Sequence, residues 1–251
     1  MSSLSVVLPA YNEEANAQSA VEQVSAVAQQ LGMDYEIILV NDGSADRTGE
    51  IGRELMERIP NFRLVEHYPN RGYGGSLKAG FAAATKDLIA FVPADNQFDF
   101  GEISRLLERL DEAEIVSGHR AEREDHFIRK VNAFGWNTVV RLLFGYLCHD
   151  IDCGFKLFRR EILDHVTLVS DGAMIDTELL AGARARGYRI AEVPVTHLPR
   201  VGGEATGANI KVIARAFRDL ARFRVRLSRE LREEKRKTAR DRTHAQRESA
   251  M

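Results

Sequence analysis

Residues 5–48 read SVVLPAYNEEANAQSAVEQVSAVAQQLGMDYEIILVNDGSADRT and hold two short apolar runs on either side of a helix-length segment. The runs, at 5–8 and at 35–40, are rich in the β-branched and aliphatic residues that favour strands. Between them, apolar residues recur at the spacing of a helix from about 14 to 31. A strand, a helix and a second strand in this order predict adjacent parallel strands.

The same alternation continues along the chain. We expect a helix at about 48–58 capped by Asp46, a strand at 62–66, a loop at 70–75 leading into a helix that ends near 84, and a strand at 88–92. The less regular second half predicts helices at 103–110, 131–143 and 176–186 and strands at 114–117 and 189–195. The whole pattern predicts an α/β fold with a mostly parallel, doubly wound central sheet.

The composition is that of a folded globular protein. The chain has 251 residues, of which 44% are hydrophobic and 29% charged, enough for a sizeable core. No apolar run approaches the roughly 20 residues that a membrane-spanning helix needs, and the first residues lack a signal-peptide pattern. The two cysteines, Cys148 and Cys153, make no disulfide framework, so we expect a reduced, cytoplasmic setting.

The net charge of −2 hides an asymmetry. Residues 211–251 hold 14 Lys and Arg but 6 Asp and Glu, so this tail carries +8 and the rest of the chain −10. The tail is expected to form a long basic helix that frays after Lys237. Its apolar residues recur at helical spacing opposite a row of arginines, and they are Ile213, Phe217, Leu220, Phe223 and Leu227.

Two interpretations of this amphipathic segment stay open. A basic amphipathic helix over 211–237 can lie on an anionic membrane surface, which would place the protein on the cytoplasmic face of the membrane. Alternatively, its apolar stripe packs on the folded domain or on a second copy of the chain in a homodimer. Nucleic-acid binding is not expected, because no recognition motif accompanies the basic residues.

Polar residues follow four of the expected strands, at 11–13, 41–42, 70–71 and 95–97. In open α/β sheets, ligands bind outside the carboxyl ends of the strands, so these four loops predict one ligand site. A nicotinamide-type Rossmann site is excluded, because the first turn lacks its glycine fingerprint. For the loop at 42–44 alone, a turn that caps the next helix is an equally good interpretation.

Several segments, in this order and spacing, resemble glycosyltransferase family 2. They are VVLPAYNEE (6–14), VNDGSADRT (40–48), the loop at 70–80 and PADNQFD (93–99). The segments GHR (118–120), CGFK (153–156), DTEL (176–179) and EVPV (192–195) resemble its dolichol-phosphate mannosyltransferase-like branch. The resemblance implies a GT-A-type, Rossmann-like nucleotide-binding domain over 1–210, followed by the basic helix and frayed tail at 211–251.

The resemblance also implies roles for individual residues. The nucleotide-sugar pocket is expected to include Pro9, Tyr11, Glu13 and Asp42. Asp95 matches the second Asp of a D-x-D motif, and with Gln97 it is expected to bind Mg²⁺ or Mn²⁺, which prefer oxygen ligands. Pro93 replaces the first Asp, so the protein would supply few ligands and the metal would bind weakly. The alternative is that Asp95 only caps the helix at 100–110.

Cations gather between residues 120 and 130. The resemblance implies that Arg120 holds the donor diphosphate and that Arg129, with Lys130 and Arg200, holds an acceptor phosphate, since guanidinium groups suit phosphate oxygens. We assign catalytic roles to Asp95, Arg120 and Arg129. A solvated loop is the alternative, because acidic residues are interleaved with Arg123 and its neighbours. The roles of Asp176 and Glu178 stay open, since a helix N-terminus also favours carboxylates.

The leading hypothesis is inverting transfer of a hexose from a GDP- or UDP-linked sugar to a polyprenyl phosphate. A phosphate monoester is already anionic near neutral pH, so it needs cations and no general base. A family 2 enzyme that glycosylates a small-molecule or protein hydroxyl is the alternative. It would need a base, for which Asp125 and Asp152 are candidates. A second alternative, suggested by Pro93, is a non-catalytic nucleotide-sugar-binding protein.

Overall fold

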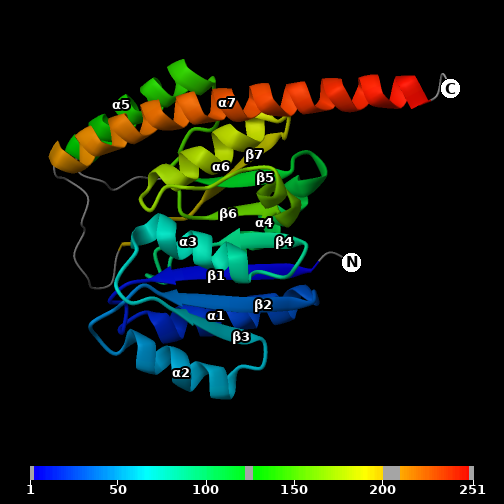
Figure 1. Ribbon diagram of the computed structural model, residues 1–251. Helices are drawn as coiled ribbons and strands as arrows, with labels where there is room; N and C mark the ends of the chain where they lie inside the picture. Colours follow the sequence, from blue (N-terminus) through cyan, green and yellow to red (C-terminus); the bar gives the residue numbers. More distant parts are fainter. Residues whose placement is uncertain (1–2, 122–126, 200–209, 249–251) are drawn as a thin grey trace. The chain divides into compact units, whose positions relative to one another are not determined.

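The computed structural model describes residues 3–121, 127–199 and 210–248 (Figure 1). The chain forms two compact units, Met1–Thr206 and Gly207–Met251. A seven-stranded sheet is the centre of the first unit, with strand order β3-β2-β1-β4-β6-β5-β7. Its strands are β1 (Leu4–Ala10), β2 (Tyr35–Asn41), β3 (Phe62–Glu66), β4 (Leu88–Phe91), β5 (Ile115–Arg120), β6 (Lys156–Arg159) and β7 (Ile190–Val195).

The strand pairing confirms the predicted, mostly parallel sheet. β1 pairs in parallel with β2 on one side and with β4 on the other, and β5 pairs in parallel with β7. β6 lies between β4 and β5 and is antiparallel to both. The parallel strands therefore end at one carboxyl edge, which faces away from the N-terminus in Figure 1, and β6 begins at that same edge.

Helices connect consecutive strands of the first unit, and they are α1 (Ala17–Leu31), α2 (Thr48–Arg58), α3 (Gly72–Ala83), α4 (Ile103–Glu108), α5 (Phe127–Phe144) and α6 (Met174–Ala185). The second unit contains α7 (Ile210–Glu248). Short 3-10 turns flank α4 as η1 (Phe100–Glu102) and η2 (Arg109–Asp111), and η3 (Arg160–Asp164) follows β6.

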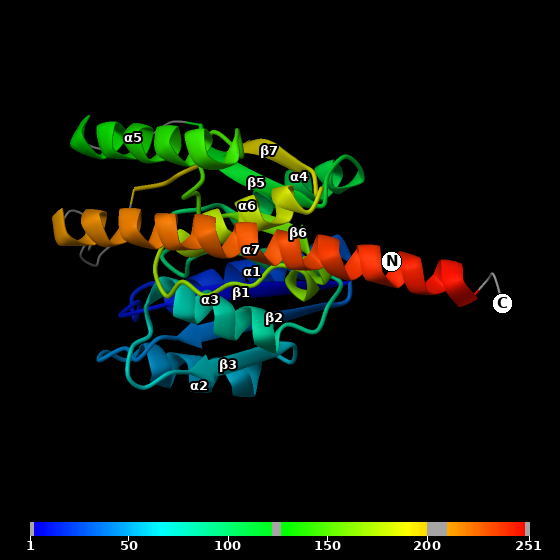
Figure 2. The same ribbon diagram turned by 45° about the horizontal axis from the view of Figure 1, so that its top comes forward.

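Both faces of the sheet are buried, which explains why β1 and β2 are mostly apolar. Leu4, Val6 and Leu8 share one core cluster with residues of α1, α2 and α4. Because successive strand side chains point to opposite faces, Val7 faces α3 instead. A Cβ on Gly80 would lie 2.2 Å from Val7 Cγ1, so only glycine lets α3 pack this closely on β1. Figure 2 shows α3 in front of β1 and β2.

The structure differs from the sequence-based prediction at three places. β6 was not predicted, because four residues that begin with a lysine carry little strand signal. The glycine-rich segment expected to be a loop up to residue 75 is already helical from Gly72. α7 continues to Glu248 instead of fraying after Lys237.

No helix among the described residues is both long enough and apolar enough to cross a membrane. The basic segment at 211–237 lies within α7.

Candidate functional site

Hydrogen bonds join the loops after β1 and β2 at the carboxyl edge of the sheet. The Asn12 backbone N–H donates to Ser44 Oγ (2.9 Å), and Asn12 Oδ1 accepts from the Ala45 N–H (2.8 Å). Asn12 has a φ of 55°, in the left-handed region that asparagine tolerates better than most residues. In addition, the Glu13 N–H donates to Thr48 Oγ1 (2.9 Å). Residues from two predicted polar loops therefore form one rigid rim.

The predicted pocket residues on this rim differ in exposure. Pro9 is buried within β1, and its carbonyl accepts from the Ala94 N–H at 3.2 Å. Glu13 is buried, and its Oε2 accepts from Asn16 Nδ2 at 2.8 Å. Tyr11 is 49% exposed, so its ring is the large apolar surface that this loop offers to a ligand. A flat nucleobase is the kind of group that stacks on such a ring.

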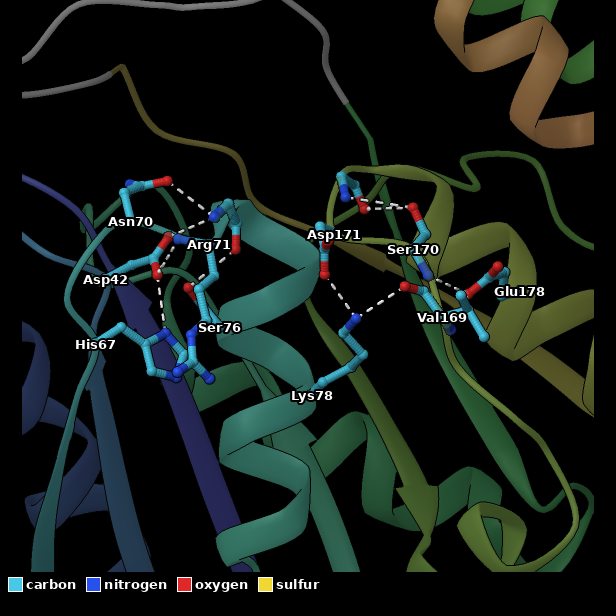
Figure 3. A network of polar contacts seen from close by, with 12 residues as sticks. Asp42, His67, Asn70, Arg71, Ser76, Lys78, Val169, Ser170, Asp171 and Glu178 are labelled. Carbon is cyan, nitrogen blue, oxygen red and sulfur yellow. Dashed lines mark hydrogen bonds and ion pairs between the residues drawn. The ribbon is translucent and has the colours of Figure 1, made fainter.

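The Asp42 carboxylate, 2% exposed at the end of β2, organises the next loop. It accepts the backbone N–H groups of Arg71 (2.9 Å) and Gly72 (2.8 Å) and lies 2.9 Å from His67 Nδ1. A carboxylate can only accept, so His67 donates this hydrogen bond. Figure 3 shows these contacts at the N-terminus of α3. Most of the hydrogen-bond acceptor capacity of Asp42 is thus used to fix this loop.

Glycines let the N-terminus of α3 touch the loop that precedes α6. A Cβ on Gly74 would lie 2.4 Å from the Ser170 carbonyl oxygen and 2.8 Å from the Gly172 carbonyl oxygen. Beside them, Lys78 Nζ donates to the Val169 carbonyl (2.8 Å) and to Asp171 Oδ1 (2.7 Å) (Figure 3). The glycines after Arg71 are needed for close backbone approach.

We expect Gly74→Ala to lower the free energy of unfolding by about 1–3 kcal/mol, as overpacking does. Its new methyl group would meet backbone atoms, which cannot rotate away. Gly135→Ala is the matched control, because a Cβ there has no neighbour within 4 Å. It should stabilise α5 slightly through helix propensity. Urea denaturation of both variants measures the difference, and equal effects would contradict the packing argument.

The structure shows what Asp176 and Glu178, whose roles the sequence left open, contact in α6 and its surroundings. Glu178 Oε2 accepts the backbone N–H groups of Val169 (2.8 Å) and Ser170 (2.9 Å), so it fixes the loop before α6. Asp176 accepts from Lys156 Nζ at 2.7 Å and from the Tyr73 hydroxyl. Burial raises the pKa of Asp176, although the nearby ammonium group opposes this. Both acids therefore hold the site together from α6.

The Asp95–Gln97 turn follows β4 at the same edge. Asp95 is 9% exposed, and its Oδ1 accepts the Gln97 N–H at 3.1 Å. The Gln97 side chain donates to the Leu198 carbonyl at 3.1 Å. The helix-cap alternative for Asp95 is wrong, because Asp99 Oδ1 caps η1 by accepting the Gly101 N–H at 2.8 Å. Asp95 is therefore not needed as a cap.

The donor set of this turn fits a hard divalent cation. Asp95 and Gln97 offer carboxylate and amide oxygens, which suit Mg²⁺ and Mn²⁺. No cluster of three or more His, Cys, Asp or Glu side chains suited to a metal occurs among residues 3–121, 127–199 and 210–248. Oxygens from a bound diphosphate or from water would have to complete the coordination.

Arg120 lies at the end of β5 and is held by Asp150. Its Nε lies 2.7 Å from Asp150 Oδ2, and its Nη2 lies 2.9 Å from Oδ1, which is a bidentate ion pair. Both side chains are largely buried. The sequence predicted Arg120 as a phosphate ligand but not this carboxylate partner. The pair fixes the direction in which the guanidinium group points.

Other predicted cations lie outside what the structure describes. Arg129 and Lys130 belong to α5, but their side chains are outside the described residues. Arg123, Asp125 and Arg200 fall wholly outside them. The phosphate-binding roles of these residues therefore stay predictions.

Asp152 lies in the loop that connects α5 to β6, and Lys156 is the first residue of β6. Lys156 is fully buried, and Asp176 and Cys153 keep its pKa above the ordinary value although burial opposes the charge. Asp152 is exposed, but protein groups surround much of its carboxylate. The resulting loss of hydration, together with the charge of Asp176, raises its pKa to about 6. Burial also raises the pKa values of Cys148, to about 12, and Cys153, to about 11, so both thiols stay protonated.

We expect Asp152→Asn to raise the free energy of unfolding at pH 7.5. Its pKa in the folded state is about 6, above the ordinary 3.8, so ionisation destabilises the folded state. This cost is absent below about pH 3.8, grows up to pH 6 and is complete above it. The gain in the variant should therefore be smaller at pH 4.5 than at pH 7.5 in urea denaturation. Equal gains at both pH values would contradict the shift.

Sequence reasoning missed three residues of this edge, namely His67, Asp150 and Lys156. Each acts through a partner 20 to 30 positions away in the sequence, as in the pairs with Asp42, Arg120 and Asp176. Lys156 alone gave a local signal, because a lysine among apolar residues in FKLF is unusual unless it is paired.

Comparisons with known proteins agree with this architecture. The family model for glycosyl transferase family 2 matches residues 5–167. Similar relatives are the undecaprenyl-phosphate 4-deoxy-4-formamido-L-arabinose transferases of Enterobacter sp. (strain 638) and Edwardsiella ictaluri (strain 93-146). Each is 32% identical over 213 residues, which are 84% of this chain and 64% of the relative. The match thus spans a little under two thirds of those relatives.

Among solved structures, glucosyl-3-phosphoglycerate synthase from Mycobacterium tuberculosis in complex with phosphoglyceric acid is similar, with a TM-score of 0.69. Its identity is 21%, and the match covers 90% of this chain and 80% of that one. This similarity confirms the predicted GT-A-type fold. With the family match over residues 5–167, it leads to one conclusion: the chain belongs to glycosyl transferase family 2.

Proposed function

We propose that this protein transfers a hexose from a nucleotide diphosphate sugar to a polyprenyl phosphate, with inversion at the anomeric carbon. The observation that carries the proposal is the 32% identity to two transferases whose names specify an undecaprenyl-phosphate acceptor. Residues 1–210 would form the catalytic domain, and 211–251 the basic helix and tail.

The residues at the carboxyl edge suit this chemistry. A bound divalent metal would neutralise charge on the departing nucleoside diphosphate. Asp95 and Gln97 would hold it, and Tyr11 would stack on the base while Pro9, Glu13 and Asp42 shape the pocket floor. Arg120, aimed by Asp150, would contact the donor diphosphate, and Arg129, Lys130 and Arg200 the acceptor phosphate. Because the acceptor is an anion, cations must offset the repulsion between two phosphate groups.

We favour UDP over GDP as the donor nucleotide and Mn²⁺ or Mg²⁺ as the metal. Solved structures of the M. tuberculosis synthase with Mn²⁺ and UDP, and with Mg²⁺ and UDP, support this choice through a shared fold at 23% and 22% identity. A thermal-shift panel of UDP, GDP and their hexose conjugates with each metal tests it, because a bound ligand stabilises the folded state. A larger shift with GDP would contradict it.

Incubation with radiolabelled UDP-hexose, Mn²⁺ and undecaprenyl phosphate tests the activity. The expected product carries the label into the organic phase. Label in a water-soluble product would favour the hydroxyl-acceptor alternative, for which Asp152, with its pKa of about 6, is the candidate base. Binding of the donor without any product would favour a non-catalytic binding protein.

We also propose that the basic helix holds the enzyme peripherally on the cytoplasmic face of the membrane. The row of arginines along α7 complements anionic lipid headgroups. Flotation with liposomes that contain anionic phospholipid should recover the full chain but not a chain without residues 211–251. Equal recovery of both chains would contradict the proposal. A dimer in solution that dissociates when residues 211–251 are deleted would favour packing between two copies of the chain.

A further inference from the structure

The carboxylate of Asp152 lies in a group of charged residues. Within the described part of the chain, no hydrogen bond or ion pair engages its side chain. The neighbouring charges are already matched, because Arg120 pairs with Asp150 and Lys156 pairs with Asp176. Asp152 is exposed, and all four of these charged groups act on its charge.

The loop that carries Asp152 touches the turn that carries Asp95. A Cβ on Gly154 would lie 2.9 Å from Pro93 Cγ and 3.0 Å from Pro93 Cδ, so the two loops are in direct contact. Pro93 stands where the D-x-D pattern has its first carboxylate. The β4 turn therefore lacks the first acid of the pattern, although it keeps Asp95, and the loop before β6 brings a further acid to the same part of the sheet edge.

The ionised carboxylate of Asp152 lowers the stability of the folded state, and a residue with only a structural role would not have this effect. The groups that face it are Asp176 and Asp150, which repel its charge, and Lys156 and Arg120, which attract it. Burial and repulsion prevail and raise its pKa to about 6, so the ionised form destabilises the folded state at neutral pH. Groups kept at such a cost in a ligand site are candidates for function.

We infer that Asp152 accepts hydrogen bonds from hydroxyl groups of the transferred hexose and so selects the sugar. Phosphate groups are excluded as its ligand, because a carboxylate repels them. The sugar is the part of a nucleotide-sugar donor that is neutral and rich in O–H donors, and the two carboxylate oxygens can accept from two adjacent hydroxyls. The inference rests on the proposed function, because it requires a nucleotide-sugar donor.

The test compares UDP with UDP-hexoses in binding, so it needs no acceptor. Competition against a fluorescent UDP probe in the presence of Mn²⁺ gives the Kd of UDP, UDP-glucose, UDP-galactose and UDP-N-acetylglucosamine for the full chain. At pH 7.5, we expect one UDP-hexose to bind more tightly than UDP. Asp152→Asn should weaken binding of that UDP-hexose by about 10- to 100-fold, the range for hydrogen bonds to a charged group, and change the Kd of UDP by less than about twofold.

Deoxy analogues of that UDP-hexose identify the contact. Removal of the contacted hydroxyl should weaken binding to the wild type much more than to Asp152→Asn, since the neutral amide makes a weaker hydrogen bond to that hydroxyl than the carboxylate does. In the wild type, the affinity for the UDP-hexose should also fall below pH 6, and in the variant it should not. Asp164→Asn is the control, because Asp164 is an exposed acid in η3, beyond the opposite end of β6.

Three results would overturn the inference. One is that none of the tested UDP-sugars binds the wild type more tightly than UDP. Another is a variant that loses affinity for UDP and UDP-hexose alike, which would assign Asp152 to the nucleotide or metal site. The third is an unchanged affinity for the UDP-hexose with a lower kcat, which would assign it a role as base. Failure of the proposed function is distinct, because it appears as absence of label in the organic phase.

Discussion

Asp95→Ala is expected to lower kcat/KM for transfer by roughly 100- to 1000-fold while the protein stays folded. Stabilisation of transition-state charge by a bound metal amounts to several kcal/mol, and each 1.36 kcal/mol is a factor of ten in rate. Asp95 is the one carboxylate on the β4 turn before Asp99, since Pro93 carries no ligand group. Few other protein oxygens can therefore replace it. The loss should grow as Mn²⁺ is made limiting.

Asp99→Asn is the matched control for this experiment. It removes the same charge four residues further along the chain, where the side chain caps η1. Asparagine caps a helix about as well as aspartate, so we expect little change in stability and a kcat/KM near the wild-type value. Full activity of Asp95→Ala at limiting Mn²⁺, measured as label in the organic phase, would sink the assignment of Asp95 to the metal site.

Lys156→Met is expected to lower the free energy of unfolding by about 3–5 kcal/mol, the cost of leaving one partner of a buried ion pair uncompensated. Lys156 is 0% exposed and Asp176 is 2% exposed, so the Asp176 charge would be left without a matching cation. The nearby Asp150 and Asp152 carboxylates add to the repulsion that the ammonium group offsets. Urea denaturation at pH 7.5 measures the loss.

Two further variants make this prediction specific. Lys78→Met breaks a pair whose Asp171 side chain is 71% exposed, so its cost should stay below about 1 kcal/mol. The double variant Lys156→Met with Asp176→Leu removes both buried charges and should recover much of the lost stability. A double variant as unstable as the single one would show that the packing of Lys156, and not its charge, stabilises this region. The double variant can also be measured if Lys156→Met alone fails to fold.

The sequence predicted the regular half of this fold well, because β1 to β4 and their helices follow local patterns. The apolar runs of β1 and β2 are buried on both faces, so their composition alone identifies them. β6 was missed because its place between β4 and β5 depends on pairing with strands distant in the chain. The sequence predicts a loop at Gly72 to Gly75, because the helix there is stabilised by tertiary contact with Ser170 to Gly172 and not by helix propensity.

The candidate site shows the same division. The strand-end pattern predicted which loops gather at the carboxyl edge. It could not predict how the acids in them are used, because that depends on partners elsewhere. Asp42 accepts hydrogen bonds from the Arg71 and Gly72 backbone, and Glu178 from the Val169 and Ser170 backbone. Neither contact can be predicted from the local sequence.

The insertion of β6 between β4 and β5 has a consequence for the growing chain on the ribosome. β1 to β4 can pair as soon as residues up to Phe91 have emerged, since their partners are neighbours in synthesis order. The free side of β4 must then wait for β6, whose residues are made only after α5. During that interval the nascent sheet carries an open, apolar edge, the kind of surface on which chains aggregate or chaperones bind. The edge is covered once Lys156–Arg159 have emerged and paired with β4.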